Sequence, residues 1–300
     1  MASRSLAAFL ILLVVTIAAT EPSRNSCSGV NFHCKKLFTP SETVAIIQQM
    51  KSLPVQLDDW VDKSVKRTNY FCQGLAVTSP ESPYAWIFKK ILPLYSTNGE
   101  SMESFVSRID FILLHEFDES GFFDWHVDTK PGDGTHRTDN INVMLTDRSD
   151  YKGGDLMVGS TNVEAEQGDC YSYPASFPHK VGDLTRGQRH TFIIAMTSRE
   201  LSVEQQQAYW DRAEENHKEI CAGNPAESKL HLLHGEFLIA LGRPDQEVDC
   251  KFADMYASTS EAEQYATNFS DNGEKLRQAG KMDEATGFLA MADMIRSRLR

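Results

Sequence analysis

The chain has 300 residues, which is enough for one large domain or two modest ones. Hydrophobic residues make up 41% of it and charged residues 24%, as in ordinary soluble globular proteins. The formal net charge of −12 disfavours phosphate backbones and anionic membrane surfaces as partners, so we expect no binding to nucleic acid.

The first 20 residues have the pattern of a cleaved secretory signal peptide. Arg4 precedes the nearly continuous apolar stretch Leu6–Ala19, and small residues stand near its end. A membrane anchor is the alternative, but the run is shorter than the roughly 20 residues that span a bilayer. We therefore expect a signal peptide over residues 1–20, no stable membrane span after its removal, and a place in the secretory pathway, either in the endoplasmic reticulum lumen or outside the cell.

Six cysteines are consistent with an oxidising compartment, and they are Cys27, Cys34, Cys72, Cys170, Cys221 and Cys250. The chain has no Cys-x-x-Cys pair, so a zinc site is not indicated. Cys221 and Cys250 flank a helical segment and are the first candidates for a disulfide. Cys170 falls in an expected core strand, where a buried free thiol is an equal alternative.

Residues 21–103 are expected to form a supporting region of helices and strands. Residues 21–40 show little periodicity and are predicted to be irregular. Thr39, followed by Pro40 and Glu42, is typical of the start of a helix. Beyond it we predict a second helix over residues 57–66, a strand over 70–78 and a helix over 83–95.

From Ser104 the pattern changes to short, β-rich apolar segments separated by turn residues. Strands are predicted over residues 105–114, 140–145, 155–158, 169–173 and 190–197. Many short strands at such spacing indicate a sandwich or barrel. After Glu200 the pattern is helical, with helices predicted over residues 201–220, 230–241, 262–278 and 283–299. We therefore divide the chain into residues 21–103, a strand-rich core over 104–199, and a helical region over 201–300.

The strand-rich core contains residues that suit a mononuclear iron site. His126 and Asp128 are two residues apart and project from the same side of an extended strand, because side chains alternate along a strand. His179 offers a second imidazole. Two histidines and one carboxylate are the ligand set of non-haem Fe(II) oxygenases, which leaves open positions for substrate and oxygen. Arg189 follows in an apolar strand, where a permanent cation needs an anionic partner.

The surrounding segments resemble the catalytic core of the Fe(II)/2-oxoglutarate-dependent dioxygenases, in particular the prolyl 4-hydroxylase-like branch. The resemblance covers roughly residues 104–199. It is carried by Gly-Phe-Phe-Asp-Trp-His-Val-Asp (121–128), Tyr-Lys-Gly-Gly-Asp-Leu (151–156), Glu-Gln-Gly-Asp-Cys-Tyr-Ser-Tyr-Pro (166–174), Phe-Pro-His-Lys-Val (177–181) and Gly-Gln-Arg-His-Thr (187–191). None of these motifs is specific alone, but their order is.

The resemblance implies an α+β fold with a double-stranded β-helix (jelly-roll) core, supporting N-terminal helices and a C-terminal all-helical extension. It implies catalytic residues His126, Asp128, His179 and Arg189. The first three would hold Fe(II), and Arg189 with Thr191 would bind the far carboxylate of the co-substrate 2-oxoglutarate. O₂ would be the oxidant, and ascorbate the expected reductant that keeps the iron active.

Two positions depart from collagen-type prolyl 4-hydroxylases, which carry lysine where this chain has Arg189 and tyrosine where it has Phe117. Both changes weaken the expectation that collagen-like proline is the substrate.

Three functions stay open at this point. The first, which the secretory signal favours, is hydroxylation of proline or lysine in polypeptides of the secretory pathway. The second is hydroxylation of a small metabolite. The third is an inactive binding protein that acts through its helical tail, and the intact ligand set argues against it. The helical region itself either covers apolar surface of the core or provides a surface for a partner or substrate chain. The oligomeric state does not follow from the sequence.

Overall fold

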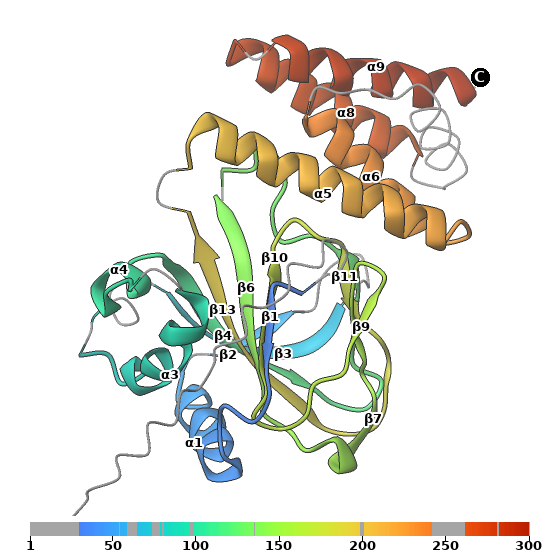
Figure 1. The fold of residues 1–300 in the computed structure, drawn as a ribbon. Coiled ribbons are helices and arrows are strands. Elements are labelled where there is room, and N and C mark those ends of the chain that lie inside the picture. The colour runs from blue at the N-terminus through green and yellow to red at the C-terminus, as the bar shows by residue number, and fades with distance from the viewer. Residues whose placement is uncertain are drawn as a thin grey trace, which may run out of the picture.

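The computed structural model has a strand-rich core and a helical C-terminal part (Figure 1). It describes residues 30–53, 55–58, 65–73, 79, 81–96, 99–134, 136–198, 201–241, 262–280 and 282–299. The described strands are β1 (Phe32–Cys34), β2 (Val55–Asp58), β3 (Val65–Gln73), β4 (Ile109–Phe117), β5 (Phe122–His126), β6 (Arg137–Met144), β7 (Tyr151–Gly153), β8 (Leu156–Val158), β9 (Thr161–Val163), β10 (Cys170–Pro174), β11 (His179–Val181), β12 (Leu184–Gly187) and β13 (Arg189–Thr197). The described helices are α1 (Pro40–Met50), α3 (Ala85–Tyr95), α4 (Met102–Val106), η1 (Arg148–Asp150), α5 (Val203–Gly223), α6 (Ser228–Ala240), α8 (Ala262–Gln278) and α9 (Met282–Arg298).

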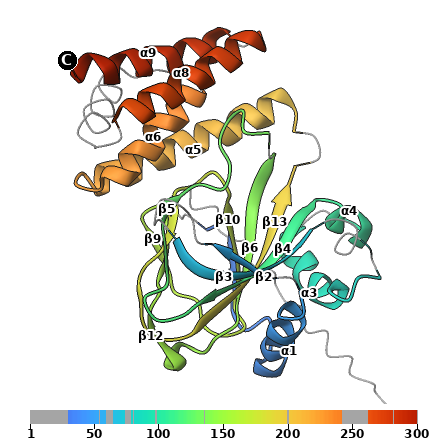
Figure 2. The ribbon, with the colours of Figure 1, turned by 180° about the vertical axis from the view of Figure 1, so that it is seen from behind.

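Most strands join into one curled antiparallel sheet. Its order is β1-β10-β6-β13-β4-β3-β5-β11-β8-β9, with β2 paired to β3. β3 turns the corner, because its first residues pair with β5 and its later residues with β4. The sheet therefore folds back on itself as the predicted jelly roll, and the small β7–β12 sheet lies at the end opposite α5 (Figure 2).

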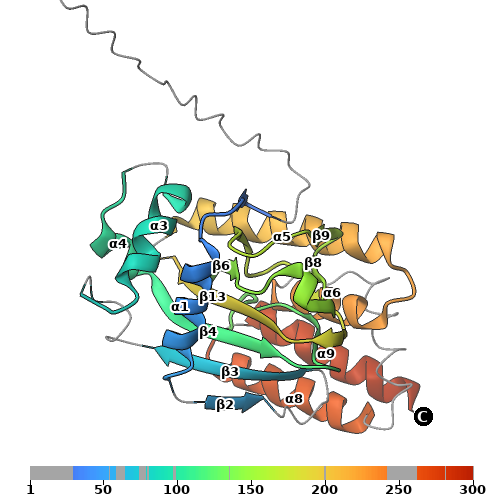
Figure 3. The ribbon, with the colours of Figure 1, turned by 90° about the horizontal axis from the view of Figure 1, so that it is seen from below.

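Side chains alternate between two faces of the long strands, and this alternation separates the core from the site. On β13, Phe192 and Ile194 face a core that α1, α3 and α4 cover, whereas Arg189 and Thr191 face the inside of the curl. The covering helices and α8–α9 lie toward opposite sides of the molecule (Figure 3). The buried members of this core include Ile46, Met50, Ile87, Phe88, Phe105, Ile112, Leu114, Ile141 and Val143.

The N-terminal region differs in part from the prediction. The start of α1 is as expected, because the Thr39 side chain accepts from the Glu42 amide and Glu42 caps Thr39 in return. Residues 21–40 were expected to be irregular, but Phe32–Cys34 pairs with β10 as strand β1. The helix predicted over 57–66 is wrong, because Val55–Asp58 pairs with Arg67–Tyr70 as an edge of the sheet.

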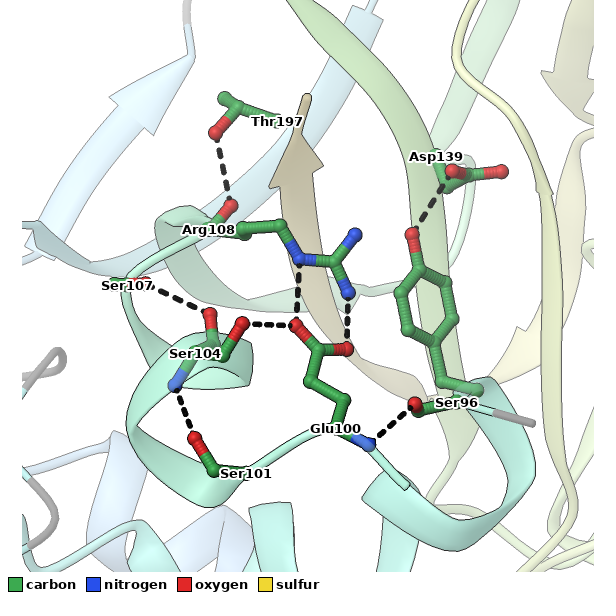
Figure 4. Close-up of polar contacts among 9 residues, drawn as sticks. Ser96, Glu100, Ser101, Ser104, Ser107, Arg108, Asp139 and Thr197 are labelled. Carbon is green, nitrogen blue, oxygen red and sulfur yellow. Dashed lines mark hydrogen bonds and ion pairs between the residues drawn. The ribbon is translucent and has the colours of Figure 1, made fainter. Parts of the chain in front are cut away.

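The first strand of the predicted core also begins later in the chain than expected. Residues 102–106 form the short helix α4, and β4 begins only at Ile109. A polar network joins α4 to the sheet (Figure 4). Arg108 donates to both carboxylate oxygens of Glu100 at 3.1 and 2.6 Å, and the Tyr95 hydroxyl donates to Asp139 at 3.0 Å. Glu100 also accepts from Ser104 of α4 at 2.7 Å. Asp139 is on β6, so the Tyr95 hydrogen bond links α3 to the strand that also carries Asn140 of the cleft.

The C-terminal helices match the prediction closely in their bounds, and α8 and α9 form the expected antiparallel pair. Ala213 of α5 and Phe237 of α6 belong to the same buried cluster as Phe117 and Tyr171 of the strands. This packing favours a covering role for α5 and α6. None of the helices in the described part of the chain has both the length and the apolar character that a membrane span requires.

Three cysteines are described with their side chains, and all three are free thiols. Cys170 is buried, as one of the two sequence alternatives has it, and it faces Cys34 across β1 and β10. Cys221 is a buried thiol on α5. Its predicted disulfide partner Cys250, like Cys27, lies outside the described residues.

Candidate active site

The curl of the sheet encloses a cleft of about 690 Å³. His126 is the last residue of β5, and His179 the first of β11, and the two are direct partners in the antiparallel register. Asp128 follows His126 by two residues. The local pattern His-Val-Asp and a long-range strand pairing thus bring the three predicted ligands to one point.

Among the described residues these three form the one group of histidine, cysteine or acidic side chains that could hold a metal ion. Their ligand atoms all lie within 4.8 Å of one another. Nε2 of His126 is 3.6 Å from one carboxylate oxygen of Asp128, and Nε2 of His179 is 3.3 Å from the other. The arrangement matches the two-histidine, one-carboxylate set that non-haem Fe(II) requires.

Backbone carbonyls fix the orientation of both imidazoles. Nδ1 of His126 lies 2.8 Å from the carbonyl oxygen of Asp124, and Nδ1 of His179 lies 2.9 Å from that of Phe177. A carbonyl oxygen can only accept, so each Nδ1 carries the proton and each Nε2 offers its lone pair to the centre. Such hydrogen bonds are typical of metal-bound histidines.

Asp128 is held in its charged form. Burial opposes its ionisation, but His179, His126 and the amide of Asn140 outweigh burial and lower the pKa of the carboxyl. Asn140 donates to Asp128 at 2.5 Å from the neighbouring strand β6. Burial, together with the charge that His179 would carry, lowers the pKa of His126 well below its usual value. The neutral imidazole and the carboxylate are the forms that bind a cation.

Arg189 and Thr191 lie deeper in the same cleft. The Arg189 side chain is only 2% exposed, and its guanidinium carbon lies 5.7 Å from the Phe117 ring. Its Nε and the Thr191 hydroxyl have no hydrogen-bond partner among the described residues. A buried guanidinium with an unused donor beside an unused hydroxyl suits a bound carboxylate. The residues present therefore fit the far end of a dicarboxylate.

The Gly-Gly-Asp-Leu motif makes room for this arginine. Gly154 has a φ of +64°, and a Cβ added there would lie 3.1 Å from Cδ of Arg189 and 2.9 Å from Cδ1 of Leu184. A side chain at this position would be strained and would crowd the guanidinium stem. The second glycine of the motif therefore serves the cation rather than the metal.

Comparison with models of protein families finds no match for this chain. Among curated proteins, PKHD-type hydroxylase YbiX of Escherichia coli (strain 55989 / EAEC) is 25% identical over 171 residues, which cover 53% of this chain and 74% of the relative. PKHD-type hydroxylase Syncc9902_2001 of Synechococcus sp. is 28% identical over 116 residues, so this chain spans about half of its length (52%). PKHD-type hydroxylase GOX0559 of Gluconobacter oxydans is 36% identical over 87 residues, 26% of this chain and 38% of the relative.

Solved structures with a related arrangement include prolyl hydroxylases. A Pseudomonas putida prolyl-4-hydroxylase matches with a TM-score of 0.43 and 13% identity, covering 58% of this chain and 95% of that one. A prolyl hydroxylase from Trichoplax adhaerens, in complex with a hypoxia inducible factor oxygen degradation domain peptide fragment, matches with a TM-score of 0.42 and 11% identity, covering 57% and 84%.

The curated relatives are hydroxylases, and His126, Asp128 and His179 form a ligand group that suits iron. This chain is similar to the Fe(II)/2-oxoglutarate-dependent dioxygenases. Its catalytic domain is of the prolyl 4-hydroxylase-like kind, and the family implies Fe(II), 2-oxoglutarate and O₂ as its cofactor and co-substrates.

Several residues of this dioxygenase cleft were not singled out by sequence. Phe123 stacks on the His126 ring at a centroid distance of 3.5 Å, and the Arg67 guanidinium lies 4.0 Å from the Phe123 ring. The Tyr173 ring lies 4.9 Å from His179. The aromatic Phe-Phe before the His-Val-Asp motif was a usable indication for Phe123. Tyr171 and Tyr173 lie in the family-like segment 166–174, which gave them no specific role. No local pattern pointed to the other lining residues, which include Arg67, Arg137, Asn140 and Asn142.

Two other histidines lie near the cleft strands in different surroundings. His115 is buried and lines the cleft. His190 pairs with Glu116 at 2.7 Å on the other face of the sheet. Trp125 is buried against Ile220 and Leu230 of the C-terminal helices.

Proposed function

We propose that this chain is a 2-oxoglutarate-dependent peptidyl hydroxylase whose iron is held by His126, Asp128 and His179. Arg189 and Thr191 bind the far carboxylate of 2-oxoglutarate. The observation that carries the proposal is the convergence of three oriented ligand atoms within 4.8 Å, in one cleft with a buried arginine whose Nε has no partner among the described residues.

When bound, iron and 2-oxoglutarate would supply oxidative chemistry in which O₂ converts 2-oxoglutarate to succinate and CO₂ and hydroxylates a substrate C–H bond. The chain's own part is to hold and shield this chemistry. Asn140 keeps Asp128 charged and in place, and the carbonyls of Asp124 and Phe177 keep both imidazoles in the ligating tautomer. Arg189 fixes the direction in which the co-substrate lies.

The cleft has room for more than a dicarboxylate, which supports a polypeptide as the hydroxylated partner. Its rim includes Lys229 and Glu236 of α6 and Lys130 of the loop after β5, so the mouth extends beyond the metal ligands. The Trichoplax relative in structure holds a peptide fragment. Proline or lysine in secretory-pathway proteins is the substrate class that we infer, with ascorbate as the reductant.

Substrate-triggered succinate formation tests this proposal and separates it from the alternatives. The purified protein is given Fe(II), 2-oxoglutarate, ascorbate and air, first with a set of proline- and lysine-containing peptides and then with a set of small metabolites. Stimulation by peptides that gain one oxygen atom supports the proposal. Stimulation by metabolites alone identifies a metabolite hydroxylase. Iron-independent peptide binding without succinate identifies a binding protein.

A further inference from the structure

The closed end of the cleft contains a second hydroxyl that the site as described does not use. Tyr171 is fully buried on β10, and its side chain lines the cleft together with Arg189 and Thr191. The Arg189 side chain lies beside its hydroxyl and can donate to the oxygen, but the hydroxyl proton has no acceptor in the described part of the chain. A buried hydroxyl of this kind needs an explanation, because leaving it unpaired is costly. A ligand in the cleft would provide the partner.

The strand register places Tyr171 on the same face as the carboxylate-binding residues. It pairs with Asn142 of β6, and Asn142 pairs with Ile193 of β13. Ile193, Thr191 and Arg189 are every second residue of β13, so these three side chains, Asn142 and Tyr171 all point into the curl. Burial raises the pKa of Tyr171 to about 12, although the neighbouring charge of Arg189 acts against this rise. The hydroxyl therefore keeps its proton near neutral pH and can donate it.

Phe117, on the strand beside Arg189, has no hydroxyl that could donate to a ligand carboxylate. It lies directly opposite Arg189 on β4 and is fully buried, with its ring beside the guanidinium. This is the position at which the chain has phenylalanine instead of the tyrosine of collagen-type prolyl 4-hydroxylases. On the β4 side, the guanidinium therefore lies beside a ring without a hydroxyl. On the β10 side it lies beside the Tyr171 hydroxyl, whose proton has no acceptor among the described residues.

We propose that the Tyr171 hydroxyl donates a hydrogen bond to the far carboxylate of 2-oxoglutarate, beside Arg189 and Thr191. The inference rests on the proposed function, since it adds a binding residue to the same co-substrate site.

The test compares two ligands that differ in the far carboxylate. 2-Oxopentanoate keeps the chelating head and the chain length of 2-oxoglutarate but ends in a methyl group. Binding of each ligand to Fe(II)-loaded protein is measured without oxygen by equilibrium dialysis, for the original chain and for Tyr171→Phe. Tyr171→Phe is expected to raise the Kd for 2-oxoglutarate roughly ten- to hundredfold, as for loss of a hydrogen bond to a charged group. The Kd for 2-oxopentanoate stays unchanged.

Tyr151→Phe is the matched control. Tyr151 is also buried in the same cluster, but its hydroxyl contacts the sulfur of Met144 and the residue does not line the cleft. It should leave the Kd for both ligands unchanged. The inference is overturned if Tyr171→Phe changes neither Kd, changes both equally, or has no more effect than Tyr151→Phe.

Arg189→Ala distinguishes a failure of the Tyr171 inference from a failure of the proposed function. If Arg189→Ala weakens 2-oxoglutarate binding and Tyr171→Phe does not, the inference about Tyr171 fails while the proposed function stands. If Arg189→Ala also leaves 2-oxoglutarate binding unchanged, the carboxylate site itself is wrong, and the proposed function fails with it.

Discussion

At the scale of single residues, the site depends on charges that have fixed partners. The Arg189 guanidinium is buried, and its Nε has no partner among the described residues. We predict that Arg189→Ala leaves iron in place but raises the 2-oxoglutarate requirement steeply. Loss of a charge-assisted pair in a dry site costs about 2–5 kcal/mol, or roughly 30- to 5,000-fold in affinity. Arg189→Lys, which keeps the charge, should lose much less. Equal KM values for 2-oxoglutarate in the original chain and Arg189→Ala would contradict the assignment.

Asn140 is expected to support metal binding through its hydrogen bond to Asp128. Its amide donates to Asp128 from the adjacent strand. Removing such a partner typically weakens metal affinity about 10- to 100-fold. We predict that Asn140→Ala does so in a competition titration with a metal chelator. Asn142→Ala, two residues further along the same face, should bind metal as the original chain does. A wild-type metal affinity in Asn140→Ala would show that Asp128 needs no such support.

The residues whose roles follow from local motifs could be predicted from the sequence. The residues whose roles depend on partners across strands could not. His126, Asp128, His179 and Arg189 stand in recognisable motifs, and the structure gathers them in one cleft. Asn140 and Tyr171 acquire their roles only from the register of β6, β10 and β13, which no short stretch of sequence records.

At the scale of elements, α5 holds the loop that leads into the ligand His179. The Ser176 amide donates to the Tyr209 hydroxyl at 3.2 Å, and Nε2 of His217 donates to the Ser176 carbonyl at 3.0 Å. His217 is completely buried, which lowers its pKa to about 3. The helix therefore docks through a neutral histidine.

This docking makes stability depend on pH. Between about pH 6.5 and 3 the unfolded chain binds a proton at His217 that the folded chain does not. The folded state therefore loses stability as pH falls through this range, by up to about 1.4 kcal/mol per pH unit from this group. We predict that His217→Gln flattens the acid side of the stability curve, measured by urea unfolding at several pH values. The same slope in both proteins would contradict the role of His217.

The elements themselves were predictable where local pattern and pairing agree. Strands β6, β8, β10 and β13 and the C-terminal helices were placed correctly, because their apolar periodicity matches their burial. The short strands β7, β9, β11 and β12 between them were not predicted. β1 and β2 were missed, since each is a short edge strand defined by a distant partner. Pairing of Val55–Asp58 with β3 overrode the helical spacing of the apolar residues near it.

At the scale of the whole molecule, the helical region divides into two parts with different consequences. α5 and α6 share buried clusters with the strands, whereas α8 and α9 pack chiefly on each other and on Ile239. We predict that a chain ending after Leu241 stays folded and binds iron, while a chain ending near Glu200 is insoluble or unfolded. Thermal unfolding and iron content distinguish the two. A stable, iron-binding chain ending near Glu200 would show that α5 and α6 are dispensable to the core and would favour a recognition role for them.

The central proposal for the whole molecule is that this one cleft performs Fe(II)- and 2-oxoglutarate-dependent oxidation. The most direct measurement is the conversion of 2-oxoglutarate to succinate by the purified protein with the peptide set, compared with Asp128→Ala. We predict succinate formation that requires both Fe(II) and O₂, increases with a peptide substrate, and disappears together with iron binding in Asp128→Ala. Equal succinate formation and iron content in the two proteins would contradict it.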